Sequence, residues 1–344
     1  MTKIKAGILG ATGMVGQRFI ELLENHPWFE LTDLIASREE SGKSYGEVMQ
    51  GKWVQEKEIP KQAASMIVKH SDELVSCQVL FSSIPADIAF KLELDYARKG
   101  IAVISNASAH RMSKNVPLLV PEVNAEQLDW IELQKKENQS QGFIVTNPNC
   151  STVPLTIILR ALEQFEPIQL MVTTMQAVSG AGYPGVPSLD VLDNIVPYIG
   201  GEEQKIESET IKITGMKNLK VSASCNRVNV KDGHLESISI KFKNKPSQEQ
   251  LIQALQNFEA EPQKLNLPTA PKPCIVVRTE QNRPQPRLDR MNGNGMAITV
   301  GRIRPCPILD YKMTILGHNT IRGAAGAAVL NAELLYVKGF FEKK

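Results

Sequence analysis

The chain has 344 residues, 42% of them hydrophobic and 22% charged, and a formal net charge of +2. This length exceeds what one hydrophobic core usually supports, so we expect two domains of roughly 150 residues each. The balanced charge gives no basic footprint for nucleic acid and no electrostatic membrane anchor. Its apolar stretches fall short of the roughly 20 residues that cross a bilayer. Because a strand-like pattern begins at once, without a signal-peptide region, the sequence predicts a cytoplasmic location.

Strands and helices alternate in the first part of the chain. Buried strands are predicted at 4–10, 29–37, 78–83 and 102–106. Helices with apolar residues at helical spacing are predicted at 14–26 and 86–100. Repeated strand–helix–strand units indicate a parallel sheet with right-handed crossovers.

After residue 150 the pattern changes to neighbouring strands with few helices between them. Helices are predicted at 151–165 and 319–337, and strands at 169–178, 221–230, 234–242, 274–279, 296–304 and 311–316. Strands that follow one another without a helix favour an antiparallel or mixed sheet. The proline-rich segment 283–287 predicts an exposed loop or a subunit contact.

A glycine-rich loop directly follows the first strand. Gly10, Gly13 and Gly16 have the G-x-x-G-x-x-G spacing, a variant of the dinucleotide-binding fingerprint. The first glycine permits a tight turn, the second lets the backbone approach a pyrophosphate, and the third lets the helix pack closely. Since a strand precedes this loop and a helix follows it, the loop predicts a nicotinamide dinucleotide site.

The end of the second strand bears on the choice of cofactor. An NAD site places an acid there for the ribose 2′-hydroxyl. This chain has Ser37 and Arg38 instead, a hydroxyl and a guanidinium that suit a 2′-phosphate, so NADP(H) is favoured. Glu39 and Glu40 follow immediately and keep NAD open as the alternative.

Cys150 lies at a strand-to-helix junction in the stretch TNPNCSTVP. The partial positive charge at a helix N-terminus favours the thiolate, and unpaired N–H groups there can hold an oxyanion. The structural alternative is a small buried apolar residue, which is our expectation for the other four cysteines. All five are dispersed, with no C-x-x-C pair and no zinc-ligand spacing, so we expect reduced thiols and no metal.

A candidate base and a candidate clamp lie near Asp232–Gly233. This turn signal joins two strand-like runs and predicts that Arg227 and His234 lie on paired neighbouring strands. The turn type, and with it whether the two side chains share a face, is left open. A lone histidine is more often structural, so its position alone makes His234 only a candidate base.

Motifs spread along nearly the whole chain resemble aspartate-β-semialdehyde dehydrogenases of the archaeal and fungal branch. They are GILGATGMVGQRF, TNPNCSTV, SGAGYPGVPSLD, GGEEQK, RVNVKDGHLES and LGHNTIRGAAGAAVLNAEL. The resemblance implies NADPH-dependent reductive dephosphorylation of L-aspartyl 4-phosphate to L-aspartate 4-semialdehyde, a step toward lysine, threonine and methionine. It also implies a homodimer, or a dimer of dimers, with no nucleic-acid or membrane partner.

Catalytic and substrate-binding roles are implied by matching position. Cys150 is the implied nucleophile and His234 the implied acid/base. Gln176 is implied to orient intermediates, and the Asn149 side chain can stabilise an oxyanion. The implied substrate contacts are Arg227 for the α-carboxylate, Glu202 for the α-amino group, and Lys205 and Arg111 for the phosphate.

The implied fold is α/β and resembles glyceraldehyde-phosphate dehydrogenase. An N-terminal Rossmann-type domain, 1–149 plus 319–344, binds NADP, and a mixed-sheet α+β domain, 150–318, carries catalysis and dimerisation. The implied cofactor-binding residues are Gly10, Ala11, Thr12, Gly13, Met14, Val15, Ser37, Arg38, Ser82, Ser179, Gly180 and Asn319.

Three other functions remain open at this stage. Malonyl-CoA or succinyl-CoA reductases resemble this branch and use the same cysteine. N-acetylglutamyl-phosphate reductase is more distant, because its cysteine motif ordinarily has Gly where this chain has Asn149. A non-catalytic, redox-sensing NADP-binding protein would have no need for a nucleophile, a base and a carboxylate clamp together.

Overall fold

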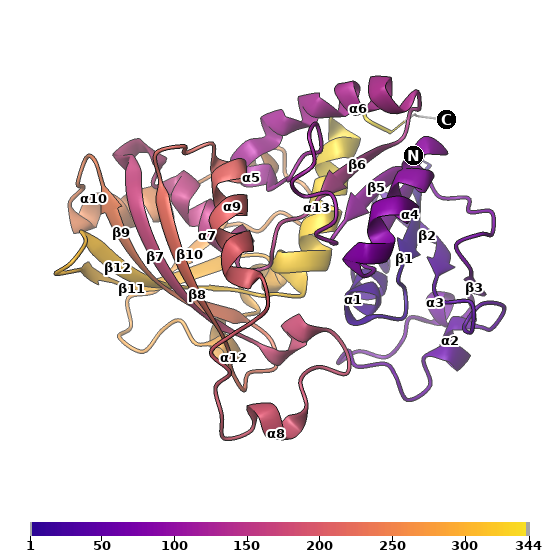
Figure 1. Cartoon of the computed structure of the whole chain (residues 1–344), viewed down its shortest axis with the longest axis horizontal. Coiled ribbons are helices and arrows are strands. Elements are labelled where there is room, and N and C mark those ends of the chain that lie inside the picture. The colour runs from indigo at the N-terminus through magenta and orange to yellow at the C-terminus, as the bar shows by residue number, and fades with distance from the viewer. Residues whose placement is uncertain (1, 342–344) are drawn as a thin grey trace. The chain divides into compact units, whose positions relative to one another are not determined.

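The structure, a computed structural model, describes residues 2–341. The chain forms two compact units. Unit 1 comprises residues up to 119 together with 126–147 and those from 325 onward, and unit 2 comprises 120–125 and 148–324. The helix at the end of the chain therefore belongs to the same unit as the N-terminal strands. Figure 1 shows this helix in yellow beside the indigo and purple elements of unit 1.

Unit 1 is built on a parallel sheet of six strands in the order β3-β2-β1-β4-β5-β6. The strands are β1 (Ile4–Leu9), β2 (Phe29–Ile35), β3 (Val68–Lys69), β4 (Val79–Ser82), β5 (Ala102–Ser105) and β6 (Phe143–Thr146). The strand order reverses between β1 and β4, which is where doubly wound sheets bind nucleotides. The predicted Rossmann-type parallel sheet is confirmed.

The helices of unit 1 cover this sheet. They are α1 (Met14–Leu23), α2 (Tyr45–Val48), α3 (Lys61–Ser65), α4 (Ala86–Arg98), α6 (Trp130–Asn138) and α13 (Gly326–Val337). Helix α13 packs against α1 and β5, and nearly every one of its side chains is buried. Its Gly and Ala residues permit this close approach.

Unit 2 contains a mixed six-stranded sheet in the order β10-β11-β12-β9-β7-β8. Its strands are β7 (Pro167–Gln176), β8 (Lys220–Arg227), β9 (His234–Phe242), β10 (Ile275–Val277), β11 (Ile298–Pro305) and β12 (Tyr311–Gly317). Its helices are α5 (Pro121–Asn124), α7 (Thr152–Ala161), α8 (Ser188–Val191), α9 (Glu202–Thr214), α10 (Gln248–Gln256), α11 (Glu261–Lys264) and α12 (Pro286–Asp289). The predicted mixed sheet is confirmed.

The mixed sheet has one buried face and one exposed face. Along β9, His234, Glu236, Ile238 and Ile240 are buried, whereas Ser237 and Lys241 are exposed. Helices α7, α9 and α10 pack on strands of this sheet. Because side chains alternate along a strand, the register of β9 alone decides which residues reach the interior.

The prediction that Arg227 and His234 lie on paired strands is wrong. β7 lies between β8 and β9, pairing parallel with the first and antiparallel with the second. The linker that contains Asp232–Gly233 is too long for a two-residue hairpin, and it bonds instead to the end of β7, where Val228 N–H donates to Gln176 O. Arg227 and His234 nevertheless share the buried face, one on each side of β7.

Candidate active site

Cys150 lies two residues before α7, as predicted for a residue at a helix N-terminus. Its loop is held by side chains of unit 2: the Asn149 N–H donates to Glu209 at 2.6 Å, and Ser151 N–H donates to Asn149 Oδ1 at 3.0 Å. Gly323 packs on the other side, where an added Cβ would lie 2.6 Å from Cys150 Cβ. The thiol is therefore fixed in place beside the positive end of the α7 dipole.

Three strands bring the other catalytic candidates to one row of the mixed sheet. Gln176 ends β7 and pairs with Arg227, which ends β8. His234 begins β9 and pairs with Gly317 of β12. All four positions lie at the same end of the sheet, so residues from four strands converge there.

Cys150 and His234 form a hydrogen-bonded pair, with Sγ 3.1 Å from Nε2. His234 Nδ1 accepts the Ala177 N–H at 3.0 Å, so a neutral ring carries its proton on Nε2, facing the sulfur. Burial, with smaller contributions from Arg227 and His318, lowers the pKa of His234 to about 3. A neutral ring with its proton on Nε2 can donate a hydrogen bond to Cys150 Sγ.

Arg227 supplies positive charge next to this pair. The guanidinium is buried, and its Nη1 donates to Ala177 O at 2.7 Å. Burial lowers the pKa of Arg227, while the Cys150 and Glu202 charges oppose that shift. Gly180 packs closely against both side chains, because a Cβ there would come within 2.8 Å of Arg227 Nη1 and 3.2 Å of His234 Nε2.

Glu202, the first residue of α9, is the centre of a second cluster. Its carboxylate accepts from Asn149 Nδ2 at 2.6 Å, Lys205 Nζ at 3.0 Å and Gln176 Nε2 at 3.4 Å. Burial opposes ionisation, but Lys205 and these hydrogen bonds hold the pKa of Glu202 below its usual value. The Asn149 amide is thus directed at Glu202 in this structure.

The cofactor candidates Ser179 and Asn319 also lie in unit 2, and they bond to each other. Asn319 Nδ2 donates to Ser179 Oγ at 2.7 Å, and Asn319 Oδ1 accepts the Gly233 N–H at 2.8 Å. They therefore support the turn that leads into His234, in addition to any contact with a cofactor.

Several residues at this site escaped the sequence analysis. Ala177 acts through its backbone, which no side-chain pattern reveals. Glu209 and His318 are buried, as Gly323 is, and lie far along the chain from Cys150. The only signal that could have found Gly323 is its place in the small-residue run before α13.

The glycine-rich loop of unit 1 has the shape expected for a dinucleotide site. Gly10 has a φ of +84°, and a Cβ on Gly16 would lie 2.2 Å from Gly10 O. Gly13 caps α1 without a side-chain hydrogen bond, and a Cβ there meets only Gly10 O at 3.5 Å. Thr12 lies between these glycines, Ala11 precedes it, and Met14 and Val15 begin the helix. The N–H groups of the first turn are therefore available to an anion.

Near the predicted 2′-phosphate position the charges are already paired. Glu40 accepts from Thr12 Oγ1 at 3.2 Å and from Ser37 Oγ at 3.0 Å. Arg38 is exposed and contacts Asp72 at 2.8 Å. An exposed ion pair of this kind is weak, so the guanidinium can exchange Asp72 for a phosphate.

Two further predicted residues belong to unit 1. Ser82 ends β4 and is fully buried next to the switch point of the sheet. Arg111 is buried, and its Nη2 donates to Asn106 O at 2.8 Å. Asn106 follows β5, so Arg111 is tied to the carboxyl end of the parallel sheet.

The remaining cysteines divide into two groups. Cys77, Cys225 and Cys274 are buried, and burial raises the pKa of each, to about 12 for Cys77 and about 11 for Cys225. Cys306 differs from the expected buried residue: it is partly exposed, and a hydrogen bond from the Leu309 N–H lowers its pKa. Within residues 2–341 no group of three or more His, Cys, Asp or Glu side chains could hold a metal ion, and no helix could cross a membrane.

Family comparisons agree with this geometry. Residues 5–131 match the family described as "Semialdehyde dehydrogenase, NAD binding domain", and residues 159–322 match "Semialdehyde dehydrogenase, dimerisation domain". The fold and the site together define a nicotinamide-dependent oxidoreductase with a cysteine at its centre.

Curated relatives narrow this class. The chain is 49% identical to an aspartate-semialdehyde dehydrogenase of Archaeoglobus fulgidus and 50% identical to one of Schizosaccharomyces pombe, each match covering 97% of this chain and 98% of the relative. A crystal structure of aspartate semialdehyde dehydrogenase with NADP from Candida albicans matches with a TM-score of 0.90 and 44% identity, covering 99% of this chain and 100% of that one. The chain belongs to the aspartate-semialdehyde dehydrogenase family, as the motifs predicted.

Proposed function

We propose that the protein catalyses the NADPH-dependent reductive dephosphorylation of L-aspartyl 4-phosphate to L-aspartate 4-semialdehyde, with Cys150 as nucleophile. The observation that carries the proposal is the Cys150–His234 pair, 3.1 Å apart, beside a buried guanidinium and a buried carboxylate. A substrate with an α-carboxylate, an α-amino group and a reactive acyl carbon needs a cation, a carboxylate and a nucleophile in one place.

Substrate recognition uses groups of opposite charge. Arg227 binds the α-carboxylate in a bidentate manner, and Glu202 accepts from the α-ammonium group. Lys205, 36% exposed and one turn from Glu202 on α9, is proposed to bind phosphate, and the family resemblance gives Arg111 the same role. A side chain at Gly180 would collide with Arg227 and crowd the His234 ring, so this position requires glycine.

In the first step the Cys150 thiolate attacks the acyl carbon. A C–S bond forms, the C–O bond to phosphate breaks, and phosphate leaves with the electron pair and takes up a proton from water. Neutral His234 donates a hydrogen bond from Nε2, first to the thiolate and then to the oxyanion that develops near it. A hydrogen bond to a developing oxyanion contributes roughly 100- to 1,000-fold in enzymes.

The second step releases the aldehyde. When bound, NADPH supplies the hydride that reduces the thioester carbon. The C–S bond then breaks, the aldehyde forms, and Cys150 returns as a thiolate next to Arg227. Gln176, held between Thr174 and Glu202, orients the acyl oxygen during both steps.

The residues of unit 1 fit NADP(H). The uncapped N-terminus of α1 and the glycines before it form a cradle that a side chain at Gly16 would fill, so they accept a pyrophosphate. Ser37 and Arg38 are the residues proposed to bind a 2′-phosphate, and Glu40 accepts from the Ser37 and Thr12 hydroxyls. Ser82, Ser179, Gly180 and Asn319 complete the proposed set of cofactor contacts.

Phosphate-dependent oxidation of aspartate semialdehyde tests this proposal most directly. Reduction of NADP⁺, much faster than that of NAD⁺ and dependent on added phosphate, is the expected result. Malonyl-CoA and succinyl-CoA, offered with NADPH in parallel reactions, are expected to give no turnover. Turnover with a CoA thioester alone would overturn the substrate assignment and leave only the scaffold in common.

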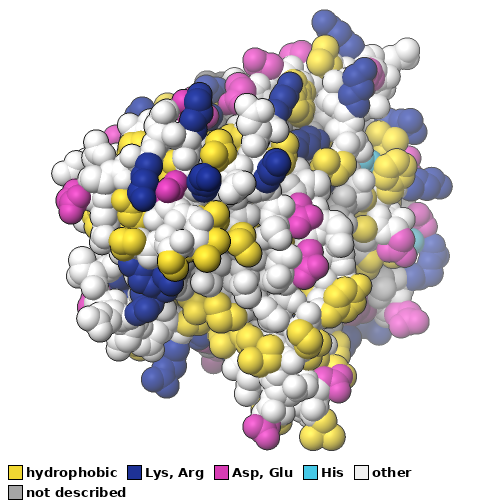
Figure 2. Space-filling view, turned by 60° about the vertical axis from the view of Figure 1, so that its left-hand side comes forward, with side chains coloured by type: hydrophobic (Ala, Val, Ile, Leu, Met, Phe, Trp, Pro, Cys, Tyr) yellow, Lys and Arg dark blue, Asp and Glu magenta, His cyan; other side chains and the backbone are white. Residues whose placement is uncertain are grey.

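We also propose a homodimer, or a dimer of dimers, in the cytoplasm. The outer face of the mixed sheet exposes Met171, and the segment around α8 exposes Leu189 and Tyr198. Figure 2, turned so that unit 2 comes forward, shows hydrophobic side chains interspersed with Lys and Arg on this face. Exposed apolar surface of this kind is typical of subunit contacts. Light scattering of the purified protein gives the mass, and a monomer would contradict this part of the proposal.

A further inference from the structure

The turn that leads into His234 is held on its β7 side by backbone hydrogen bonds. Val178 N–H donates to Val230 O at 2.8 Å, and Ser179 N–H donates to Lys231 O at 3.2 Å. These bonds fix the start of the turn. They leave its last two residues, Asp232 and Gly233, to be positioned by other parts of unit 2.

The segment from Arg283 to Arg290 packs against that end of the turn. Gly233 has a φ of +101°, and a Cβ there would lie 3.3 Å from both Arg290 Cβ and Pro286 Cβ. Arg290 Nη1 also donates to Asp232 O at 3.2 Å. The backbone immediately before the catalytic histidine therefore rests on α12 and the residue that follows it.

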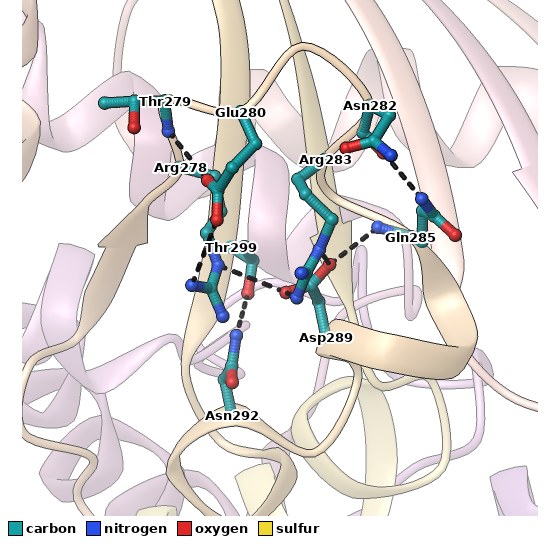
Figure 3. Close-up of polar contacts among 9 residues, drawn as sticks. All are labelled: Arg278, Thr279, Glu280, Asn282, Arg283, Gln285, Asp289, Asn292 and Thr299. Atoms are coloured by element: carbon teal, nitrogen blue, oxygen red, sulfur yellow. Dashed lines mark hydrogen bonds and ion pairs between the residues drawn. The ribbon is translucent and has the colours of Figure 1, made fainter.

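One buried carboxylate fixes this segment. Asp289 Oδ2 accepts from Arg283 Nε and from the Gln285 N–H, both at 2.7 Å, and Oδ1 accepts from Arg283 Nη2 and from Arg278 Nε. Figure 3 shows the guanidinium groups of Arg278, which directly follows β10, and of Arg283, in the loop before α12, converging on the Asp289 side chain. The Asp289 side chain has no exposed surface, so these bonds are shielded from water.

We propose that Asp289 is a positioning residue for His234. It holds α12 and Arg290 against Asp232 and Gly233, and so sets the distance between His234 Nε2 and Cys150 Sγ. The inference rests on the proposed role of this pair. It predicts that a change some residues away from the chemistry alters the reactivity of the thiolate, because a displacement of about 1 Å can cost on the order of 100-fold in rate.

Asp289→Asn tests the proposal. The amide keeps the size of the side chain, but its NH₂ group replaces an acceptor oxygen that bonds to the two arginines. We expect at least a tenfold fall in kcat with an unchanged KM for NADPH. We also expect a comparable fall in the rate at which iodoacetamide alkylates Cys150, followed at the Cys150 peptide by mass spectrometry. The alkylation needs no substrate, so it tests the position of His234 even if the proposed substrate is wrong.

Glu280→Gln is the matched control. Glu280 belongs to the same cluster and contacts Arg278 at 3.8 Å, but its side chain is 48% exposed. The control variant is expected to keep wild-type kcat and alkylation. A fall in melting temperature of Asp289→Asn with wild-type kcat and alkylation would assign Asp289 a purely structural role and overturn the proposal.

Arg290→Met provides a second route if Asp289→Asn does not fold. It removes the bond to Asp232 O and leaves the Asp289 cluster intact. A several-fold fall in Cys150 alkylation without a change in melting temperature supports the proposal. If Asp289→Asn does not fold, a folded Arg290→Met protein in which Cys150 is alkylated at the wild-type rate would contradict the proposal.

Discussion

The loop before α1 and the loop before α7 both end at a helix N-terminus, but they are built differently. Before α1 the backbone makes the site: Gly10 turns, Gly16 lets the helix approach, and Gly13 leaves the first N–H groups uncapped. Before α7 side chains make it, because Cys150 depends on His234 and on the Asn149–Glu202 contact. The first loop can bind a phosphate whatever organic group carries it. The second presents a single nucleophile to the substrate.

The difference separates two kinds of sensitivity. A backbone site is broken by adding atoms, since its hydrogen-bond donors are the same for every residue type. A side-chain site is broken by removing or neutralising single groups, and each group comes from a different strand or helix. Substitutions in the two loops should therefore give distinct patterns of lost binding and lost catalysis.

Removal of the nucleophile should have the largest effect. Cys150→Ala is expected to lower kcat by about 10⁴-fold or more, because no acyl-enzyme can form. NADP binding, which uses the loop before α1, is expected to stay within twofold of wild type. Steady-state assays and fluorescence titration with NADPH measure the two quantities. Substantial residual turnover would show that the reaction does not pass through a covalent intermediate.

The glycines before α1 allow a matched pair of substitutions. A Cβ at position 16 meets Gly10 O at 2.2 Å, so Gly16→Ala must displace the loop. We expect it to lower stability by about 1–3 kcal/mol and to abolish NADP binding. Gly13→Ala meets only Gly10 O at 3.5 Å, so it should fold normally and weaken NADP binding by roughly 10- to 100-fold.

Thermal melting and NADP titration separate the members of this pair. Equal losses of stability in both variants would show that Gly13 has a packing role and no particular role in binding phosphate. Unchanged NADP affinity in Gly13→Ala would contradict the assignment of the pyrophosphate to this helix terminus.

Local patterns in the sequence were enough to predict the loop before α1 and the parallel sheet, because strand, glycines and helix are adjacent in the chain. The same holds for Cys150 at the start of α7. The partners of Cys150 required the register of a mixed sheet. Asp232–Gly233 resembles a hairpin turn. However, β7 lies between β8 and β9 in the sheet, although it ends some fifty residues before this turn in the sequence.

The sequence could not have predicted contacts made through backbone groups or buried carboxylates. Ala177 sets the tautomer of His234 through its N–H, and any residue type except proline could do so. Asp289 lies two residues after the proline-rich segment 283–287, whose composition predicts an exposed loop or a subunit contact. Its side chain is buried, and Arg278 and Arg283 both form ion pairs with it. Such networks depend on tertiary packing, which single-sequence patterns do not encode.

Neutralising the acid of the second cluster should mainly affect substrate affinity. Glu202→Gln replaces charge-assisted hydrogen bonds, so we expect kcat/KM for aspartate semialdehyde to fall by about 10- to 100-fold, chiefly through KM. Glu203→Gln is the control, because Glu203 is adjacent on α9 but bonds to the Cys225 N–H. An equal effect of both substitutions would mean that the general charge of α9, and no specific contact with Glu202, governs affinity.

The smallest expected effect is on stability and concerns Glu236, which lies two residues after His234 on β9. Glu236 of β9 pairs with Thr174, is completely buried, and has no hydrogen-bond partner for either carboxyl oxygen. Burial raises its pKa well above the ordinary value, so the folded protein keeps this proton while the unfolded chain releases it above about pH 4.5. Its contribution to stability therefore declines as pH rises from 4.5 toward the folded pKa.

Glu236→Gln removes this dependence, because the amide does not ionise in either state. Urea unfolding at pH 4.5 and pH 7.5 is expected to give nearly equal stabilities of variant and wild type at the lower pH, and a more stable variant at the higher pH. Ser237→Ala, on the exposed side of the same strand, should show no pH-dependent difference. If the gain appeared at pH 4.5 and vanished at pH 7.5, Glu236 would be ionised in the fold and held by an interaction that lowers its pKa.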